Sequence, residues 1–307
     1  MQPPAIDFHT HPLLVREMIA RHPELARAAR ETFYIGNNFQ PLETFLLELD
    51  AAGLAEAVVV PIDATTSRGA TIYTNEQIAE LCSMSSRLIG FASVDPHQPD
   101  APDRLEYAIA GLGLRGLKLS PPTQRFFADD ESVYPLYERA RKLGIPILFH
   151  AGMSWEPGCR LAYGQPLRFE NVAADFPGLP MVLAHLAWPW VTEAVALALK
   201  YPNVHLDTSA LYFDNPRDFL SYAMTHVVPL TVFERSLRRQ IVFGSNYPRV
   251  EIKNMSRAVR SLGFSEECLA LIMGGNAERL LQAGRDTCIP GAAEGAKTSH
   301  ACAEESA

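Results

Sequence analysis

The chain has 307 residues, of which 48% are hydrophobic, 20% charged and 9% aromatic, as expected for one large globular core or two modest domains. The chain contains 27 Lys and Arg and 35 Asp and Glu, and the resulting net charge of −8 argues against a surface that binds nucleic acid or an anionic membrane. The five cysteines include no C-x-x-C pair, and we find neither a signal peptide nor an apolar run of membrane-spanning length. We therefore expect a cytoplasmic protein.

Short apolar runs alternate along the chain with longer segments of helical periodicity. Each run is flanked by Gly, Pro or Asp and has the length of a buried strand. The runs begin about 34 residues apart on average, close to the roughly 30 residues of a strand with its crossover helix. They are Ala5–Phe8, Ala57–Pro61, Leu88–Val94, Leu114–Leu119, Pro146–His150, Met181–Leu186, Val204–Thr208 and Ile241–Ser245. Their number and spacing predict an α/β fold, a single (β/α)8 TIM barrel.

The predicted barrel occupies residues 1–284, and residues 285–307 are expected to form a flexible C-terminal tail rich in Gly, Ala, Glu and Ser. The stretch between the first two runs is longer than one crossover needs, so Pro12–Phe39 is expected to be an insertion over one barrel end. A lid or a contact in a homo-oligomer are the roles considered for it. Helices are expected at Asn75–Arg87, Glu131–Leu143 and Ser265–Ala283.

The rival fold is a doubly wound sheet that binds a nucleotide. No Gly-x-Gly-x-x-Gly follows the first run, and no Gly-Lys-Ser/Thr phosphate loop occurs in the chain. Reactive side chains instead follow several different runs, which is where barrel enzymes build their active sites.

Histidines end three of the runs. Because side chains alternate along a strand, His9 and His11 lie on the same face of the first strand, about 7 Å apart in an extended chain. Two imidazoles so placed can bind one metal ion. This pair alone is equally consistent with hydrogen-bonded core histidines. His150 and His185 end two further apolar runs, and four such histidines favour a metal site or acid–base chemistry over packing.

Several longer motifs occur in chain order. They are Asp-Phe-His-Thr-His-Pro at 7–12, Gly-Leu-Lys-Leu-Ser-Pro at 116–121, Ile-Leu-Phe-His-Ala-Gly at 147–152, Leu-Ala-His-Leu-Ala-Trp-Pro-Trp at 183–190, His-Leu-Asp-Thr-Ser at 205–209, Phe-Gly-Ser-Asn-Tyr-Pro-Arg at 243–249 and Gly-Asn-Ala-Glu-Arg-Leu at 275–280. With these motifs the chain resembles the metal-dependent amidohydrolase superfamily, and within it the aminocarboxymuconate-semialdehyde decarboxylase-like branch. The resemblance covers most of the chain.

The resemblance implies a site with one divalent metal ion, most often zinc in this branch. His9, His11 and His150 would be its ligands. His185 would be a catalytic residue that touches substrate or metal-bound water and transfers a proton. Three neutral ligands would leave the ion its full charge, which acidifies bound water and polarises a carbonyl oxygen.

The chain departs from the family pattern at Asn246, where the family usually has an Asp that ligates the metal and accepts a proton from water. Asn cannot accept the proton, and it brings no negative charge to the metal. Three interpretations stay open: a natural subgroup that uses His185 as the base, a weakened or non-catalytic relative, or an engineered Asp→Asn change.

Three residues are candidates for binding substrate. Lys118 could pair with a substrate carboxylate, be carboxylated as in two-metal relatives, or be an ordinary lysine at the barrel rim. Arg249 could bind an anionic group in a bidentate manner or lie at the surface. Trp155, with Glu156 beside it, follows the fifth strand, where loops form the mouth of a barrel site. Asp207 is either a group that orients the site or a packing residue.

We therefore predict a metal-dependent hydrolase that uses metal-activated water on a small, carboxylate-bearing amide, ester or lactone. The alternative on the same ligands is a non-oxidative decarboxylase of an aromatic or unsaturated acid. A second alternative, supported by Asn246, is a non-catalytic relative that binds a metabolite or a partner chain.

Overall fold

The computed structural model of the chain describes residues 3–13, 15–32, 34–36, 38–209 and 212–282. The predicted tail at residues 285–307 lies outside the described residues. Within them, no helix has both the length and the hydrophobicity required to cross a membrane.

The described residues contain eight parallel strands, and each overlaps one of the predicted apolar runs. They are β1 (Ile6–Thr10), β2 (Glu56–Val59), β5 (Leu88–Gly90), β6 (Leu117–Leu119), β7 (Ile147–Phe149), β8 (Met181–Leu183), β9 (Val204–Asp207) and β10 (Ile241–Val242). Hydrogen bonding orders them β1-β2-β5 and β10-β9-β8-β7-β6. A bridge between Ala92 and Leu117 joins the two sheets, and the Phe8 N–H donates to the Phe243 carbonyl at 2.8 Å on the other side. The ring of strands is therefore closed, which confirms the predicted α/β barrel.

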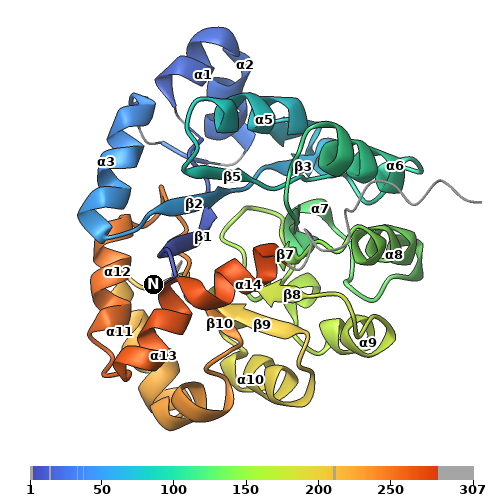
Figure 1. Cartoon of the computed structure of the whole chain (residues 1–307). Coiled ribbons are helices and arrows are strands. Elements are labelled where there is room, and N and C mark those ends of the chain that lie inside the picture. Colours follow the sequence, from blue (N-terminus) through green and yellow to red (C-terminus); the bar gives the residue numbers. More distant parts are fainter. Residues whose placement is uncertain (1–2, 14, 33, 37, 210–211, 283–307) are drawn as a thin grey trace, which may run out of the picture.

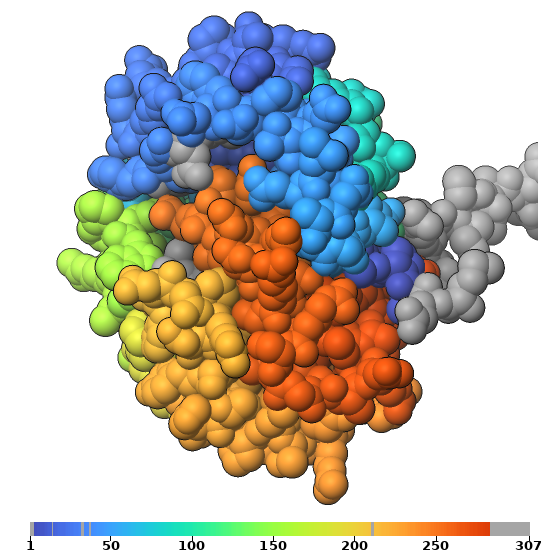
Figure 2. All heavy atoms as spheres, turned by 90° about the vertical axis from the view of Figure 1, so that its left-hand side faces the viewer, coloured from blue at the N-terminus to red at the C-terminus, as the bar shows by residue number. Residues whose placement is uncertain are grey.

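Helices surround the strands (Figure 1). Those between β1 and β2 are α1 (Arg16–Arg21), α2 (Glu24–Arg27), η1 (Ala28–Thr32) and α3 (Leu42–Ala52); the following ones, up to β8, are α4 (Thr65–Arg68), α5 (Asn75–Ser83), α6 (Ala101–Glu106), η2 (Tyr107–Gly111), α7 (Pro121–Gln124), η3 (Glu131–Val133), α8 (Tyr134–Lys142), η4 (Leu161–Gly164) and α9 (Arg168–Asp175). After β8 come η5 (Ala184–Ala187), α10 (Val191–Lys200), α11 (Pro216–Ser221), η6 (Tyr222–Val227), η7 (Val232–Ser236), α12 (Ile252–Arg260), α13 (Glu266–Ala270), η8 (Leu271–Gly275) and α14 (Asn276–Gln282). The first and last parts of the barrel meet where α3 and α12 pack side by side (Figure 2).

The predicted helices begin where local signals place them. Helix α5 starts with a capping box, in which the Gln77 N–H donates to the Thr74 hydroxyl and the Thr74 N–H donates to the Gln77 side chain. The Ser265 hydroxyl caps α13 by accepting from the Cys268 N–H at 3.2 Å.

The sequence did not predict a small antiparallel hairpin after β2. Its strands are β3 (Ile62–Ala64) and β4 (Ala70–Ile72), and α4 forms the connection between them. Three-residue strands are too short to produce a periodicity that could be recognised in the sequence. The hairpin borders the candidate site, as described below.

The barrel interior is a separate apolar cluster formed by residues from the strands and from α14. Figure 1 shows α14 lying across the centre of the barrel beside the N-terminus. The cluster consists of Ile6, Phe8, Val58, Val60, Ile89, Phe91, Leu148, Val182, Ala184, Val242, Ala277, Leu280 and Leu281. The lumen is thus packed at this end, which leaves the opposite end, at the carboxyl termini of the strands, for polar residues.

Gly116→Ala is expected to destabilise the protein. A Cβ atom at Gly116 would lie 2.4 Å from ring atoms of Phe91, and Phe91 is fully buried in the lumen. Overpacking of this kind typically costs about 1–3 kcal/mol of unfolding free energy. Urea denaturation would measure the loss, with Gly178→Ala as the matched control because nothing lies within 4 Å of the added Cβ. Equal stability of the two variants would contradict the prediction.

Candidate metal centre and active-site pocket

One pocket brings together all eight residues that the sequence singled out. The space between its lining atoms is about 530 Å³, which includes open solvent at the mouth. The sequence-predicted residues in its lining are His9, His11, Lys118, His150, Trp155, His185, Asn246 and Arg249. They lie at or after the carboxyl ends of β1, β6, β7, β8 and β10.

An irregularity in β1 directs two histidines into this pocket. The pairing register between β1 and β2 shifts between Asp7 and Thr10. Phe8 packs in the lumen cluster, yet His9, its neighbour of opposite parity, lines the pocket with His11. Regular alternation would place Phe8 and His9 on opposite faces of the strand, so the irregularity re-aims the side chains next to the site.

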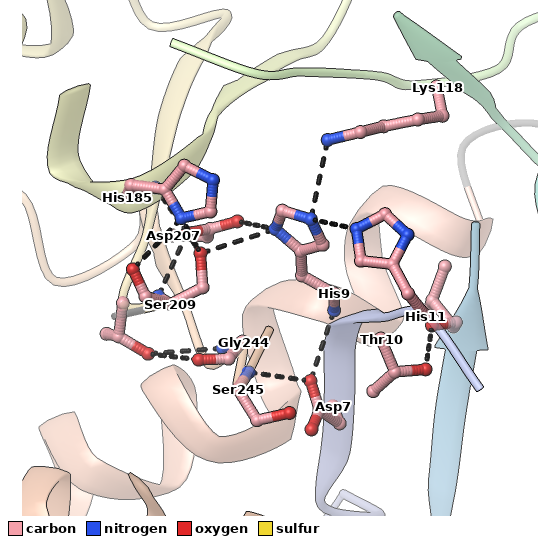
Figure 3. Close-up of polar contacts among 12 residues, drawn as sticks. Asp7, His9, Thr10, His11, Lys118, His185, Asp207, Ser209, Gly244 and Ser245 are labelled. Atoms are coloured by element: carbon pink, nitrogen blue, oxygen red, sulfur yellow. Dashed lines mark hydrogen bonds and ion pairs between the residues drawn. The ribbon is translucent and has the colours of Figure 1, made fainter. Parts of the chain in front are cut away.

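His9 and His11 face each other through unprotonated nitrogens. The Nδ1 of His9 donates to the Asp207 carboxylate at 2.7 Å, and the Nδ1 of His11 donates to the Val60 carbonyl at 3.1 Å. Burial lowers the pKa of both imidazoles, which are therefore neutral. Each Nε2 then carries a lone pair, and the two Nε2 atoms are only 3.2 Å apart. Figure 3 shows the two rings turned toward each other through these nitrogens. Two acceptors at this distance suit a shared cation.

His150 and His185 complete the group of imidazoles. The Nε2 of His150 donates to the Met153 carbonyl at 3.0 Å, so its lone pair is on Nδ1. Burial and the nearby Lys118 lower the pKa of His150 to about 3. The Nδ1 of His185 donates to the Ser209 carbonyl at 3.1 Å. The ring centroid of His185 lies 4.8 Å from that of His150 and 5.2 Å from that of His9.

The backbone is strained where it carries His185. His185, Leu186 and Ala187 have φ angles of 61°, 49° and 50°, and Asn246 has 63°. Non-glycine residues in this left-handed region typically cost about 1–3 kcal/mol each and persist only where the surrounding structure holds them. Asn tolerates the region better than most residues, so the unusual segment is the one at His185.

Asp207 orients the histidines, a role that the sequence left open against simple packing. Its Oδ2 accepts from His9, and its Oδ1 accepts from the backbone N–H groups of His185 at 2.7 Å and Ser209 at 3.0 Å. A carboxylate that accepts from a metal-binding imidazole fixes its tautomer and orientation. The sequence signal was weak, because it consisted only of the parity of Asp207 on its strand.

A second arrangement of donors is also present. One nitrogen or oxygen each from His9, His185 and Asp207 lie within 4.8 Å of one another, a spacing that a metal ion could bridge. Binding there would compete with the hydrogen bond between His9 and Asp207. The described residues thus contain a His/His/Asp candidate metal site beside the facing Nε2 pair of His9 and His11.

Two basic side chains line the same pocket. Lys118 is 1% exposed, its Nζ lies 3.4 Å from the His9 Nε2, and burial lowers its pKa to about 7. Burial also lowers the pKa of Arg249. Asn246 is held at the base of the site, where its N–H donates to the His9 carbonyl at 2.9 Å. Trp155 is 57% exposed and lies at the mouth.

The pocket has two further walls, of whose residues the sequence had offered only Glu156 as a candidate. One is aliphatic and consists of Leu13, Ile35, Ile62 and Ile72, and the other is polar and consists of Ser120, Thr123, Ser154 and Glu156. The aliphatic residues come from the segment predicted to lie over the barrel end and from the β3–β4 hairpin, whose positions no periodicity indicates.

Comparison with known proteins identifies the family. The family model described as Amidohydrolase matches residues 6–283. The chain belongs to the amidohydrolase family. The resemblance based on its motifs is therefore confirmed.

Solved structures share the fold of this amidohydrolase at low sequence identity. An uncharacterized TIM-barrel protein from Bordetella bronchiseptica superposes with a TM-score of 0.71 at 24% identity, covering 92% of this chain and 99% of that one. A 2,6-dihydroxybenzoate decarboxylase in complex with 2,6-dihydroxybenzoate gives 0.63 at 17%, covering 92% and 100%. A 5-carboxyvanillate decarboxylase from Novosphingobium aromaticivorans, complexed with manganese and 4-hydroxy-3-methoxy-5-nitrobenzoic acid, gives 0.64 at 15%, covering 91% and 96%. These likenesses establish the fold.

One curated protein matches a short part of the amidohydrolase. Protein fluG of Emericella nidulans is 31% identical over 67 residues, which are 22% of this chain and 8% of fluG.

Proposed function

We propose that this amidohydrolase is a metal-dependent decarboxylase that removes CO2 from a small aromatic or unsaturated carboxylic acid. The observation that carries the proposal is the pair of unprotonated Nε2 atoms of His9 and His11, 3.2 Å apart, in one pocket with Lys118 and Arg249. The pair suits a cation, and the two basic side chains suit an anionic substrate.

Our preferred ligands for one divalent ion are the facing pair of His9 and His11, with His150 from the same pocket as the third. His9 and His11 would bind it through Nε2, and His150 through the Nδ1 that its contact with Met153 leaves unprotonated. Asp207 would orient His9, and its existing hydrogen bonds are the reason why we prefer this set to His9, His185 and Asp207. Imidazole suits zinc and other first-row ions; zinc stays a prediction, and manganese occurs in the Novosphingobium decarboxylase. A bound ion would supply Lewis-acid polarisation of the substrate's carboxylate and adjacent oxygen.

The chain's own residues would bind and orient the acid. Lys118 and Arg249 would contact its carboxylate, and Trp155 at the mouth would contact its body. The reaction is R–COO⁻ + H⁺ → R–H + CO2, so one proton must reach the carbon that loses CO2. His185 lines the pocket and has Nδ1 on the Ser209 carbonyl, which leaves Nε2 to exchange a proton with a bound molecule.

Asn246 argues against the hydrolysis that the sequence put first. Hydrolysis needs a base to activate water, and Asn246 is an amide where the family usually has the carboxylate that serves as this base. Decarboxylation does not need that base. The two decarboxylases that share the fold bind aromatic acids, which agrees with a pocket that has an aliphatic wall and two basic side chains.

The test is turnover by the full-length protein loaded with Mn²⁺ or Zn²⁺, against hydroxybenzoates, unsaturated acids, lactones and amides. We expect CO2 release from at least one acid, with one deuterium in the product when the solvent is D2O. Hydrolysis of a lactone or amide without CO2 release would restore the first prediction. Binding of acids without any turnover would favour the non-catalytic alternative.

Asp207→Asn is expected to lower the affinity for Mn²⁺ about 10- to 100-fold, the usual effect of losing a carboxylate behind a histidine ligand. If the amide oxygen keeps accepting from the backbone N–H groups of His185 and Ser209, the amide NH2 faces the His9 Nδ1. His9 then prefers to carry its proton on Nε2, and moving that proton to Nδ1 weakens binding of the ion. Calorimetry with Asp103→Asn, an exposed position on α6, as control measures the change. A loss beyond about 1,000-fold would make Asp207 itself a ligand.

A further inference from the structure

The polar wall of the pocket contains a carboxylate that the proposed reaction does not use. Glu156 lies in the loop after β7 and lines the same pocket as the aliphatic residues. Its side chain is 10% exposed, and buried carboxylates are rarely found without partners. What holds Glu156 in place, and what it could bind, decides its role.

Donors from different parts of the barrel meet at one oxygen of Glu156, and the nearby Cys159 thiol also donates to it at 3.7 Å. The Arg68 Nη2 lies 3.0 Å from Oε2, and the Arg68 side chain is 11% exposed. The Thr123 hydroxyl donates to the same oxygen at 2.8 Å. Arg68 comes from α4 in the hairpin and Thr123 from α7. The hairpin, α7 and the loop after β7 therefore converge on this one side chain.

Thr123 and Arg68, which hold Glu156, are themselves held by further hydrogen bonds. The Thr123 hydroxyl is 2.8 Å from the Ser120 hydroxyl, and the Ser67 hydroxyl donates to the Thr123 carbonyl at 2.8 Å. Arg68 also donates to the Pro157 carbonyl at 3.3 Å. A carboxylate with so little freedom is pre-organised, so a ligand that hydrogen-bonds to it loses little conformational entropy.

The charge of Glu156 acts on the two basic side chains of the pocket. Its attraction acts to raise the pKa of Lys118 and of Arg249, although burial dominates in both and lowers them. The pocket has basic side chains that suit the acid group of a ligand, and a carboxylate held in place by Arg68 and Thr123 on its polar wall. An ionised carboxylate accepts hydrogen bonds and donates none.

We propose that Glu156 determines substrate specificity by accepting a hydrogen bond from a hydroxyl or amino group of the acid, with Arg68 as its positioning residue. That the ligand is a carboxylic acid rests on the proposed function. The ligand would lay its apolar face on Leu13, Ile35, Ile62 and Ile72 and turn its donor group toward Glu156. An analogue without that donor would bury the carboxylate without a new partner, and such sites discriminate strongly.

The test compares matched ligands on the full-length, Mn²⁺-loaded protein. Dissociation constants are measured by calorimetry for benzoate, the three monohydroxybenzoates and the three aminobenzoates. We expect at least one hydroxy- or aminobenzoate to bind about 10-fold or more tightly than benzoate, as hydrogen bonds to charged groups allow. Glu156→Ala should reduce this ratio to below about threefold, and Glu156→Gln, which keeps an acceptor oxygen, should restore part of it. The matched control is Glu76→Ala at an exposed position of α5.

The selectivity ratio separates a role in specificity from a purely structural one. If Glu156 only ties the hairpin to the loop, its replacement weakens benzoate and hydroxybenzoates equally, and the inference is overturned. Arg68→Met, which leaves the carboxylate in place but loosens it, should lower the ratio while melting temperature and metal content report any loss of folding. Selective binding that depends on Glu156, without CO2 release, would leave this inference standing and refute the decarboxylase. CO2 release, together with an unchanged ratio of hydroxybenzoate to benzoate affinity in Glu156→Ala, would support the decarboxylase and refute this inference.

Discussion

Replacing His11 by Gln is expected to lower the affinity for Mn²⁺ or Zn²⁺ by more than about 100-fold, beyond the effect usual for a residue behind a ligand. The Nε2 of His11 lies 3.2 Å from that of His9, and both are acceptors. Gln has no imidazole nitrogen to complete this pair. Elemental analysis and calorimetry would measure the loss, and turnover of any accepted acid should disappear with the ion. His226→Gln, at an exposed histidine in η6, is the matched control.

The same experiment distinguishes the two donor sets. If the ion binds to His9, His185 and Asp207, His11→Gln leaves the affinity nearly unchanged, and His185→Gln removes it. Wild-type protein should contain at most one equivalent of metal. Two equivalents would contradict the single site and make Lys118, 3.4 Å from the His9 Nε2, a candidate for a modified bridging ligand.

The barrel was predictable because its strands are buried on both faces. Such strands appear as continuous apolar runs, and Ile147–Phe149 and Met181–Leu183 are fully buried examples. The β3–β4 hairpin was not predictable, since its strands are three residues long. The register shift between Asp7 and Thr10 was not predictable either, because a pairing register depends on the neighbouring strand and leaves no local signal.

The candidate site likewise has a part that was predictable from the sequence and a part that was not. Histidines at the ends of apolar runs gave a pattern, and the structure brings His9, His11, His150 and His185 to one pocket. The contact between Arg68 and Glu156 joins residues 88 positions apart through two loops. Its geometry depends on loop conformations that side-chain periodicity does not encode. The chemistry at the strand ends and the candidacy of Trp155 and Glu156 for the pocket could thus be inferred, whereas the contacts that hold Glu156 in place could not.

Asn246→Asp is expected to raise the affinity for Mn²⁺ at least about tenfold, because a negatively charged oxygen ligand replaces a neutral amide in the pocket that contains His9 and His11. The backbone should accommodate the change, since Asp, like Asn, tolerates the φ of 63° found at this position. The carboxylate should also repel the acid group of the substrate and raise its KM in decarboxylation severalfold. Lactone hydrolysis should increase, with an upper range of about 10²–10⁴-fold for a newly positioned base.

Steady-state kinetics with a hydroxybenzoate and with a lactone, at saturating Mn²⁺, separate these effects, and Asn171→Asp on the exposed face of α9 controls for the added charge. A variant that decarboxylates at least tenfold faster than the wild type would show that the reaction needs a carboxylate at this position. Asn246 would then mark a lost or engineered function. A variant that binds the ion tightly and gains only hydrolysis would show instead that the amide keeps water activation low while the site removes CO2, because the same donors serve both reactions and the charge at residue 246 decides between them.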